Sequence, residues 1–106
     1  MARAKFQTLT EQMFYILLCL RTECCGTDIM DQVPEMTGGR IQVGSGTLYN
    51  LLEQFLDAGM IRETQAQGRR RSYLLTDKGK DLLRREYDRL NAQAADFRRA
   101  FEGGVT

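Results

Sequence analysis

The C-terminal segment, residues 77–102, constrains the fold of this chain more than any other feature. Its pattern predicts one long helix in which apolar residues recur at alternating intervals of four and three, at Leu83, Tyr87, Leu90, Ala94, Phe97 and Phe101. This spacing is typical of the narrow seam between two helices. At 1.5 Å per residue the helix would be about 39 Å long, so its far half extends beyond a small domain and needs a partner.

A second copy of the chain is the partner that the remaining sequence favours. The chain has 106 residues, and a core of that size is modest, so burial against another protomer is expected. Residues 10–23 predict a first helix that is capped by Thr10 and apolar around most of its circumference, which requires cover on more than one side. We therefore predict a homodimer whose interface combines Phe14 and Leu18 with the six regularly spaced apolar residues of the final helix, which we call the stripe.

The middle of the chain predicts two further helices. Gly26 ends the first helix, and a short second helix follows as far as the glycines at 38–39, with a kink or a new start at Pro34. A third helix begins at residue 45 or 46 and ends at Gly59.

Two short strands, residues 60–64 and 71–75, come next, and the polar segment between them predicts a hairpin tip. Thr76 then caps the final helix. This order describes a mainly α fold with a small β-hairpin. It predicts a winged helix-turn-helix over residues 1–76, followed by a C-terminal dimerisation helix over residues 77–106. The third helix would be the element that reads DNA.

The start of the third helix carries candidate DNA-binding residues. Backbone N–H groups at a helix N-terminus can face phosphate, short polar side chains can reach base edges, and asparagine can pair with adenine. We predict DNA contacts at Ser45, Thr47, Tyr49 and Asn50. The alternative is that Ser45 or Thr47 only caps the helix and that Tyr49 packs against the wing.

A local basic feature coincides with the predicted hairpin. Residues 62–80 hold six Lys and Arg against two Asp and Glu, although the net charge of the chain is only +1. Three of the cations, Arg69, Arg70 and Arg71, are adjacent at the tip. Guanidinium groups match phosphate, so we predict contacts to the DNA backbone. One alternative is that the three arginines lie in a solvated loop. Another is that one of them, Arg71, pairs with a carboxylate on the body of the domain.

Two groups of residues resemble the PadR-like transcriptional regulators. The first is Gly46-Thr47-Leu48-Tyr49 followed by Leu51, Leu52, Leu56, Gly59 and Ile61, and the second is Gly68-Arg69-Arg70-Arg71 followed by Tyr73, Leu75, Thr76 and Gly79. The resemblance covers about residues 9–82, and the single C-terminal helix looks like the short-chain branch of the family. It implies a homodimeric winged-helix repressor, dimerised by its first and last helices.

The same resemblance implies a candidate effector site. Some short members of the family bind aromatic or drug-like compounds in the space between the two last helices. In this chain Tyr87, Phe97 and Phe101 would line that space and admit a planar apolar molecule. The alternative is that the three rings serve only as packing in the seam.

The chain has three cysteines and no histidine. An odd number of cysteines argues against a disulfide framework and for a reducing cytoplasm, and there is no C-x-x-C spacing typical of a metal site. Cys19 is expected in the core. Cys24 and Cys25 fall near a predicted helix end, where exposure would make a thiol-responsive regulator the alternative function.

Several function classes are excluded by what the sequence lacks. The apolar run at residues 16–20 is far shorter than the ~20 residues of a membrane span, and no signal-like segment follows the N-terminus. No acid–base or nucleophilic group of residues indicates an enzyme. We predict a cytoplasmic, sequence-specific DNA-binding repressor that needs no cofactor, binds a pseudo-palindromic operator and is released by a small effector. The alternative from another class is a winged-helix module that contacts protein instead of DNA.

Overall fold

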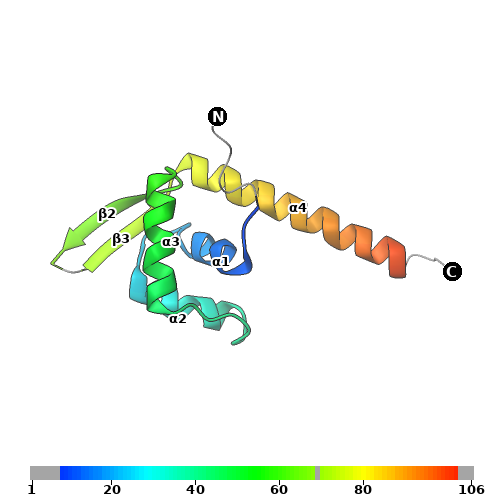
Figure 1. The fold of residues 1–106 in the computed structure, drawn as a ribbon, viewed down its shortest axis with the longest axis horizontal. Coiled ribbons are helices and arrows are strands. Elements are labelled where there is room, and N and C mark those ends of the chain that lie inside the picture. Colours follow the sequence, from blue (N-terminus) through cyan, green and yellow to red (C-terminus); the bar gives the residue numbers. More distant parts are fainter. Residues whose placement is uncertain (1–7, 69, 103–106) are drawn as a thin grey trace.

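The computed structural model describes residues 8–68 and 70–102. The elements are, in chain order, α1 (Glu11–Cys19), β1 (Cys24–Cys25), α2 (Gly26–Met36), α3 (Ser45–Asp57), β2 (Ile61–Gln67), β3 (Arg70–Leu75) and α4 (Asp77–Phe101). Three helices and a small sheet form one body, and the far half of α4 projects from it (Figure 1). The predicted fold class, a winged helix-turn-helix with a long final helix, is confirmed.

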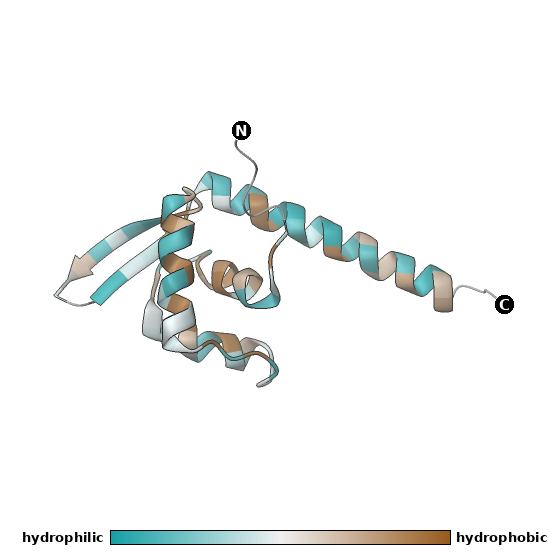
Figure 2. Cartoon of the chain, viewed as in Figure 1, coloured by the Kyte–Doolittle hydropathy of each residue, from teal (hydrophilic) through white to brown (hydrophobic). Residues whose placement is uncertain are grey.

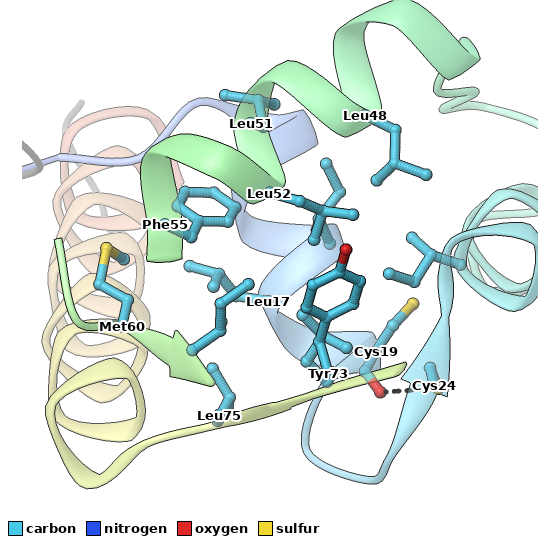
Figure 3. Close-up of a cluster of buried hydrophobic side chains, with 14 of the residues drawn as sticks. Leu17, Cys19, Cys24, Leu48, Leu51, Leu52, Phe55, Met60, Tyr73 and Leu75 are labelled. Atoms are coloured by element: carbon cyan, nitrogen blue, oxygen red, sulfur yellow. Dashed lines mark hydrogen bonds between the residues drawn. The ribbon is translucent and has the colours of Figure 1, made fainter. Parts of the chain in front are cut away.

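The core lies where α1, α2, α3 and the sheet meet. One side of α3 is buried through Leu48, Leu51, Leu52 and Phe55. In Figure 3, Leu52 and Phe55 face the space between α3, α1 and β3, where Leu17 and Leu75 lie. Burial of each such side chain contributes about 1.5–3 kcal/mol, so this cluster fixes how α3 sits on the body.

The hairpin of β2 and β3 is longer than the sequence predicts. The strands pair antiparallel from Ile61 opposite Leu75 to Gln67 opposite Arg70, with a register irregularity between Glu63 and Gln65. The predicted strands covered only residues 60–64 and 71–75. The outer part of the hairpin lacks apolar alternation because it projects away from the core (Figure 1), so hydropathy carries no strand signal there.

A third strand, β1, lies where the sequence predicts only the end of a helix. α1 ends at Cys19, and Cys24 and Cys25 then pair antiparallel with Tyr73 and Ser72 of β3. Both residues are buried, each being 4% exposed, so the exposure that a thiol-responsive regulator would need is absent at Cys24 and Cys25. The edge of β3 offers unpaired backbone groups, and two residues of the chain satisfy them.

The second helix runs through its proline. α2 continues past Pro34 to Met36, so no separate helix begins at that residue. The turn after it contains Gly38 and Gly39, which both adopt positive φ angles as expected of glycines that end a helix.

The junction between the body and α4 is tight. The Thr76 hydroxyl accepts a hydrogen bond from the Gly79 backbone N–H at 3.1 Å and donates one to the Gly59 carbonyl at 2.6 Å. This confirms Thr76 as the cap of the final helix. A side chain on Gly79 would overlap the Met60 carbonyl oxygen, so the first turn of α4 lies directly on the backbone that follows α3.

A buried carboxylate joins α4 to the segment before α1. Glu86 is 3% exposed and accepts hydrogen bonds from two nitrogens of Arg89, one of them Nε at 3.1 Å. Arg89, and the backbone N–H of Leu9 to a smaller degree, lower the pKa of Glu86. Leu9, which precedes α1, therefore lies close to Glu86 in the long helix.

Candidate nucleic-acid interface

The residues predicted to read DNA lie together at the exposed start of α3. Ser45, Thr47 and Asn50 are exposed, and Tyr49 keeps 48% of its surface accessible. The N-cap of α3 is Gly44, so neither Ser45 nor Thr47 caps the helix. Their hydroxyls do not serve that local role.

Tyr49 packs against the first residue of α2. A Cβ on Gly26 would lie 2.8 Å from Cζ of Tyr49 and would overlap its hydroxyl oxygen. The tyrosine therefore occupies the space that any other residue at position 26 would fill. The closeness of the two helices depends on this glycine.

The wing brings its arginines to the same side of the body as α3. Arg70 and Arg71 are exposed on β3, whereas Arg69 lies outside the described residues. The Nε of Arg71 lies 3.5 Å from a carboxylate oxygen of Glu63 on the neighbouring strand. The carboxylate partner of Arg71 thus lies on the wing itself and not on the body of the domain, where it was expected. The pair is largely exposed, so it contributes little to stability.

A pocket of about 460 Å³ lies between α2, α3 and the wing. Its wall includes Thr27 of α2, Tyr49 and Glu53 of α3, and Arg70 and Arg71 of β3. The Asp28 carboxylate accepts a hydrogen bond from the Cys25 backbone N–H at 3.2 Å, which lowers the pKa of Asp28 together with the nearby charge of Arg70. The wall of the pocket therefore combines Tyr49, which is predicted to contact bases, with Arg70 and Arg71, which are predicted to contact phosphate.

The acidic character of α3 is a feature that the sequence motifs do not predict. The helix contains Glu53 and Asp57 and has no Lys or Arg. Glu53 lines the pocket with three residues predicted to bind DNA, Tyr49, Arg70 and Arg71. The signal that could have found it is spacing, because Glu53 is three residues after Asn50 and four after Tyr49 on an amphipathic helix.

The predicted dimer residues divide into two groups. Phe14, Leu18, Leu83 and Tyr87 line a largely apolar pocket of about 440 Å³ between α1 and α4. Farther along α4, apolar bands continue to its end (Figure 2), with Leu90, Ala94, Phe97 and Phe101 all exposed. Phe97 and Phe101 are 55% and 74% exposed and contact each other edge to face.

The cysteines do not form a reactive cluster. Cys19 is fully buried, as predicted, and burial raises its pKa to about 11. The Cys24 thiol donates to the Cys19 carbonyl oxygen at 3.4 Å (dashed line in Figure 3), and the Cys25 sulfur lies 3.2 Å from the Thr27 hydroxyl. Within residues 8–68 and 70–102, no group of three or more metal-ligating side chains is close enough to hold an ion.

A model of the transcriptional regulator PadR-like family matches residues 16–85, which is most of the chain. The chain belongs to this family. The predicted resemblance is thereby confirmed, and the match runs from α1 into the first third of α4. The family is one of transcriptional regulators, not of enzymes.

Solved structures share the fold of this PadR-like regulator. A transcriptional regulator from Clostridium thermocellum has 15% sequence identity and a TM-score of 0.73, with 87% of this chain and 93% of that chain covered. A PadR family regulator from Eggerthella lenta has 20% identity and the same TM-score of 0.73, with 86% and 81% covered. RosR of H. salinarum has 26% identity and a TM-score of 0.66, with 90% and 81% covered.

A search of curated proteins found no match to this PadR-like chain. In the part of the chain that the structure describes, none of the helices is long and apolar enough to cross a membrane.

Proposed function

We propose that this PadR-like regulator is a cytoplasmic homodimeric repressor that binds a pseudo-palindromic DNA operator. One observation carries the proposal. Tyr49 in the first half of α3 and two arginines of β3, Arg70 and Arg71, line one pocket between the helix and the wing. A reading helix beside a basic hairpin is the arrangement that a winged helix-turn-helix uses on duplex DNA.

In this proposal α3 enters the major groove and the wing contacts the flanking backbone. Ser45, Thr47, Tyr49 and Asn50 reach bases and nearby phosphates, with Asn50 suited to adenine. Arg69, Arg70 and Arg71 contact phosphate and supply positive charge, which α3 lacks. Affinity would then come mainly from the wing, and selectivity from the helix.

The exposed stripe of α4 supports the homodimer. The intervals between the stripe residues read the same from either end of the helix. Two antiparallel copies of α4 can therefore align their stripes, which brings Phe101 opposite Leu83 of the second copy, and Phe97 opposite Tyr87. The far end of one α4 would then cover the apolar pocket between α1 and α4 of the other copy. Phe14 and Leu18 join the interface there.

The same interface provides a means by which a small effector releases the repressor from its operator. The 25 residues of α4 span about 37 Å, which is close to the ~34 Å between successive major grooves on one side of DNA. A planar aromatic effector seated among Tyr87, Phe97 and Phe101 would change how the two α4 helices cross. Because the crossing sets the separation of the two α3 helices, a molecule that binds only the shifted arrangement weakens operator binding.

DNA binding is tested by fluorescence anisotropy on the fragment upstream of the regulator's own gene, with a scrambled fragment and a series of salt concentrations. We expect tight binding to the native fragment that weakens steeply with salt. Arg70→Ala should lower affinity for both fragments and reduce the salt slope by about one. Arg85→Ala is the matched control, because it removes the same charge from an exposed ion pair with Asp81 on α4.

Two results would contradict the proposal. Equal weak binding to both fragments would remove sequence specificity and favour a winged-helix module that contacts protein. A tight affinity that is insensitive to Arg70→Ala would remove the wing from the DNA interface.

A further inference from the structure

The outward side of α3 carries acid instead of base. Leu48, Leu51, Leu52 and Phe55 are buried on one side of the helix. The helical period of 3.6 residues places Gly46, Asn50, Glu53 and Asp57 on the opposite side, and all four are exposed. We call these four residues the outer face of α3. A recognition helix turns this kind of face into the major groove.

Glu53 has no partner to neutralise it within residues 8–68 and 70–102. It makes no ion pair and no side-chain hydrogen bond there, although Arg70 and Arg71 line the same pocket. Arg71 is instead paired with Glu63 of β2. Among the residues that the structure describes, nothing therefore blocks the carboxylate of Glu53 from meeting a ligand.

An unpaired carboxylate is costly next to DNA unless it finds a hydrogen-bond donor. Duplex DNA carries one negative charge per ~1.7 Å of its axis, so a carboxylate close to it is repelled. The major groove offers donors only at particular bases. Cytosine presents its N4 amino group there, and a glutamate is the side chain that accepts from it.

We infer that Glu53 is a specificity-determining residue that accepts a hydrogen bond from cytosine N4 in the major groove. This inference rests on the proposed function. Asn50, three residues earlier on the outer face, contacts the neighbouring base pair. A DNA site that lacks a hydrogen-bond donor opposite Glu53 leaves the carboxylate charge uncompensated. The residue therefore weakens binding to incorrect sites and also strengthens binding to the correct one.

The test selects binding sites from randomised double-stranded DNA with the full-length protein and sequences them. Wild type should prefer cytosine at one position of each half-site, by about tenfold over other bases. Glu53→Ala should lose that preference and bind scrambled DNA more tightly. Glu53→Gln should shift the preference to adenine, because an amide pairs with adenine N6 and N7.

Asp57→Asn is the matched control, because it removes the same charge one turn farther along the outer face. It should leave the cytosine preference intact. A change as large as that of Glu53→Gln would show a general charge effect and overturn the inference. Thermal unfolding of all three variants should match wild type, since both carboxylates are exposed.

Failure of the inference and failure of the proposed function give different results. A wild-type motif that stays the same in Glu53→Ala and Glu53→Gln overturns the role of Glu53 alone. A wild type that selects no motif at all overturns DNA reading by α3, and the inference with it.

Discussion

The first residue of α2 lies directly against the hydroxyl end of Tyr49 in α3. A Cβ on Gly26 would overlap the Tyr49 hydroxyl and lie 2.8 Å from Cζ. The position of a residue proposed to touch DNA therefore depends on the absence of a side chain in another helix. The contact joins the two helices of the helix-turn-helix unit at the edge of the pocket that faces the wing.

Gly26→Ala should destabilise the protein by about 1–3 kcal/mol, because the added methyl group enters a filled space. Chemical denaturation measures this change in the free energy of unfolding. Gly46→Ala is the control, since no atom lies within 4 Å of a Cβ there, and alanine in a helix is about 0.5–1 kcal/mol more favourable than glycine. The double variant Gly26→Ala/Tyr49→Ala should lose less stability than the two single changes combined. An additive loss would mean that the two residues are independent.

The buried carboxylate of Glu86 in α4 should make the free energy of unfolding depend on pH. The pKa of Glu86 is lowered by Arg89 and by the Leu9 backbone N–H, so its contribution is complete above the unfolded-state pKa of about 4.3. It is lost as the pH falls through the lower folded-state value. The free energy of unfolding of wild type should therefore exceed that of Glu86→Gln at pH 7, and the difference should shrink below about pH 4.

Arg85→Ala again serves as a control, because its pair with Asp81 is exposed and should contribute less than about 1 kcal/mol. A wild-type advantage over Glu86→Gln that persists unchanged into acid would contradict the role assigned to the carboxylate.

Phe97→Asp should convert the dimer into monomers. The ring is 55% exposed in the single chain, so the substitution leaves the body intact, but it places a charge in the seam between two copies. Sedimentation equilibrium and circular dichroism separate dissociation from unfolding. Arg99→Asp introduces the same residue two positions away and outside the stripe, and it should remain dimeric. A tight dimer of Phe97→Asp would refute the seam.

The antiparallel register can be tested with two single-cysteine additions, Leu83→Cys and Phe101→Cys. A mixture of the two variants should form disulfide-linked dimers under mild oxidation, because these positions face each other in an antiparallel pair. Each variant alone should cross-link poorly. Efficient cross-linking of either variant by itself would indicate parallel helices. Wild type is the background control, since its three thiols are buried.

The native thiols should react slowly. Burial raises the pKa of Cys19 to about 11, and Cys24 and Cys25 are each only 4% exposed. Alkylation followed by mass spectrometry should modify none of the three cysteines quickly in the folded protein and all of them in denaturant. Rapid modification of Cys25 in the folded protein would revive thiol sensing as the function.

Local chemistry explains what could be predicted from the sequence. Thr10 and Thr76 cap their helices as expected, because a cap depends on a backbone N–H only three residues away. The stripe of α4 was predictable for the same reason, since its period is a property of one helix. The order of the main elements and the family resemblance followed from such local patterns.

Contacts between distant segments were decided by the tertiary structure alone. Two cysteines form a strand only because the edge of β3 passes beside them, and no periodicity exists in two residues. The same holds for the influence of the Leu9 backbone on the pKa of Glu86, for Gly26 against Tyr49, and for the pocket that places Glu53 beside the wing. A sequence specifies caps and periods within a few turns, whereas burial, pairing and an unpaired charge depend on which surfaces the folded chain brings together.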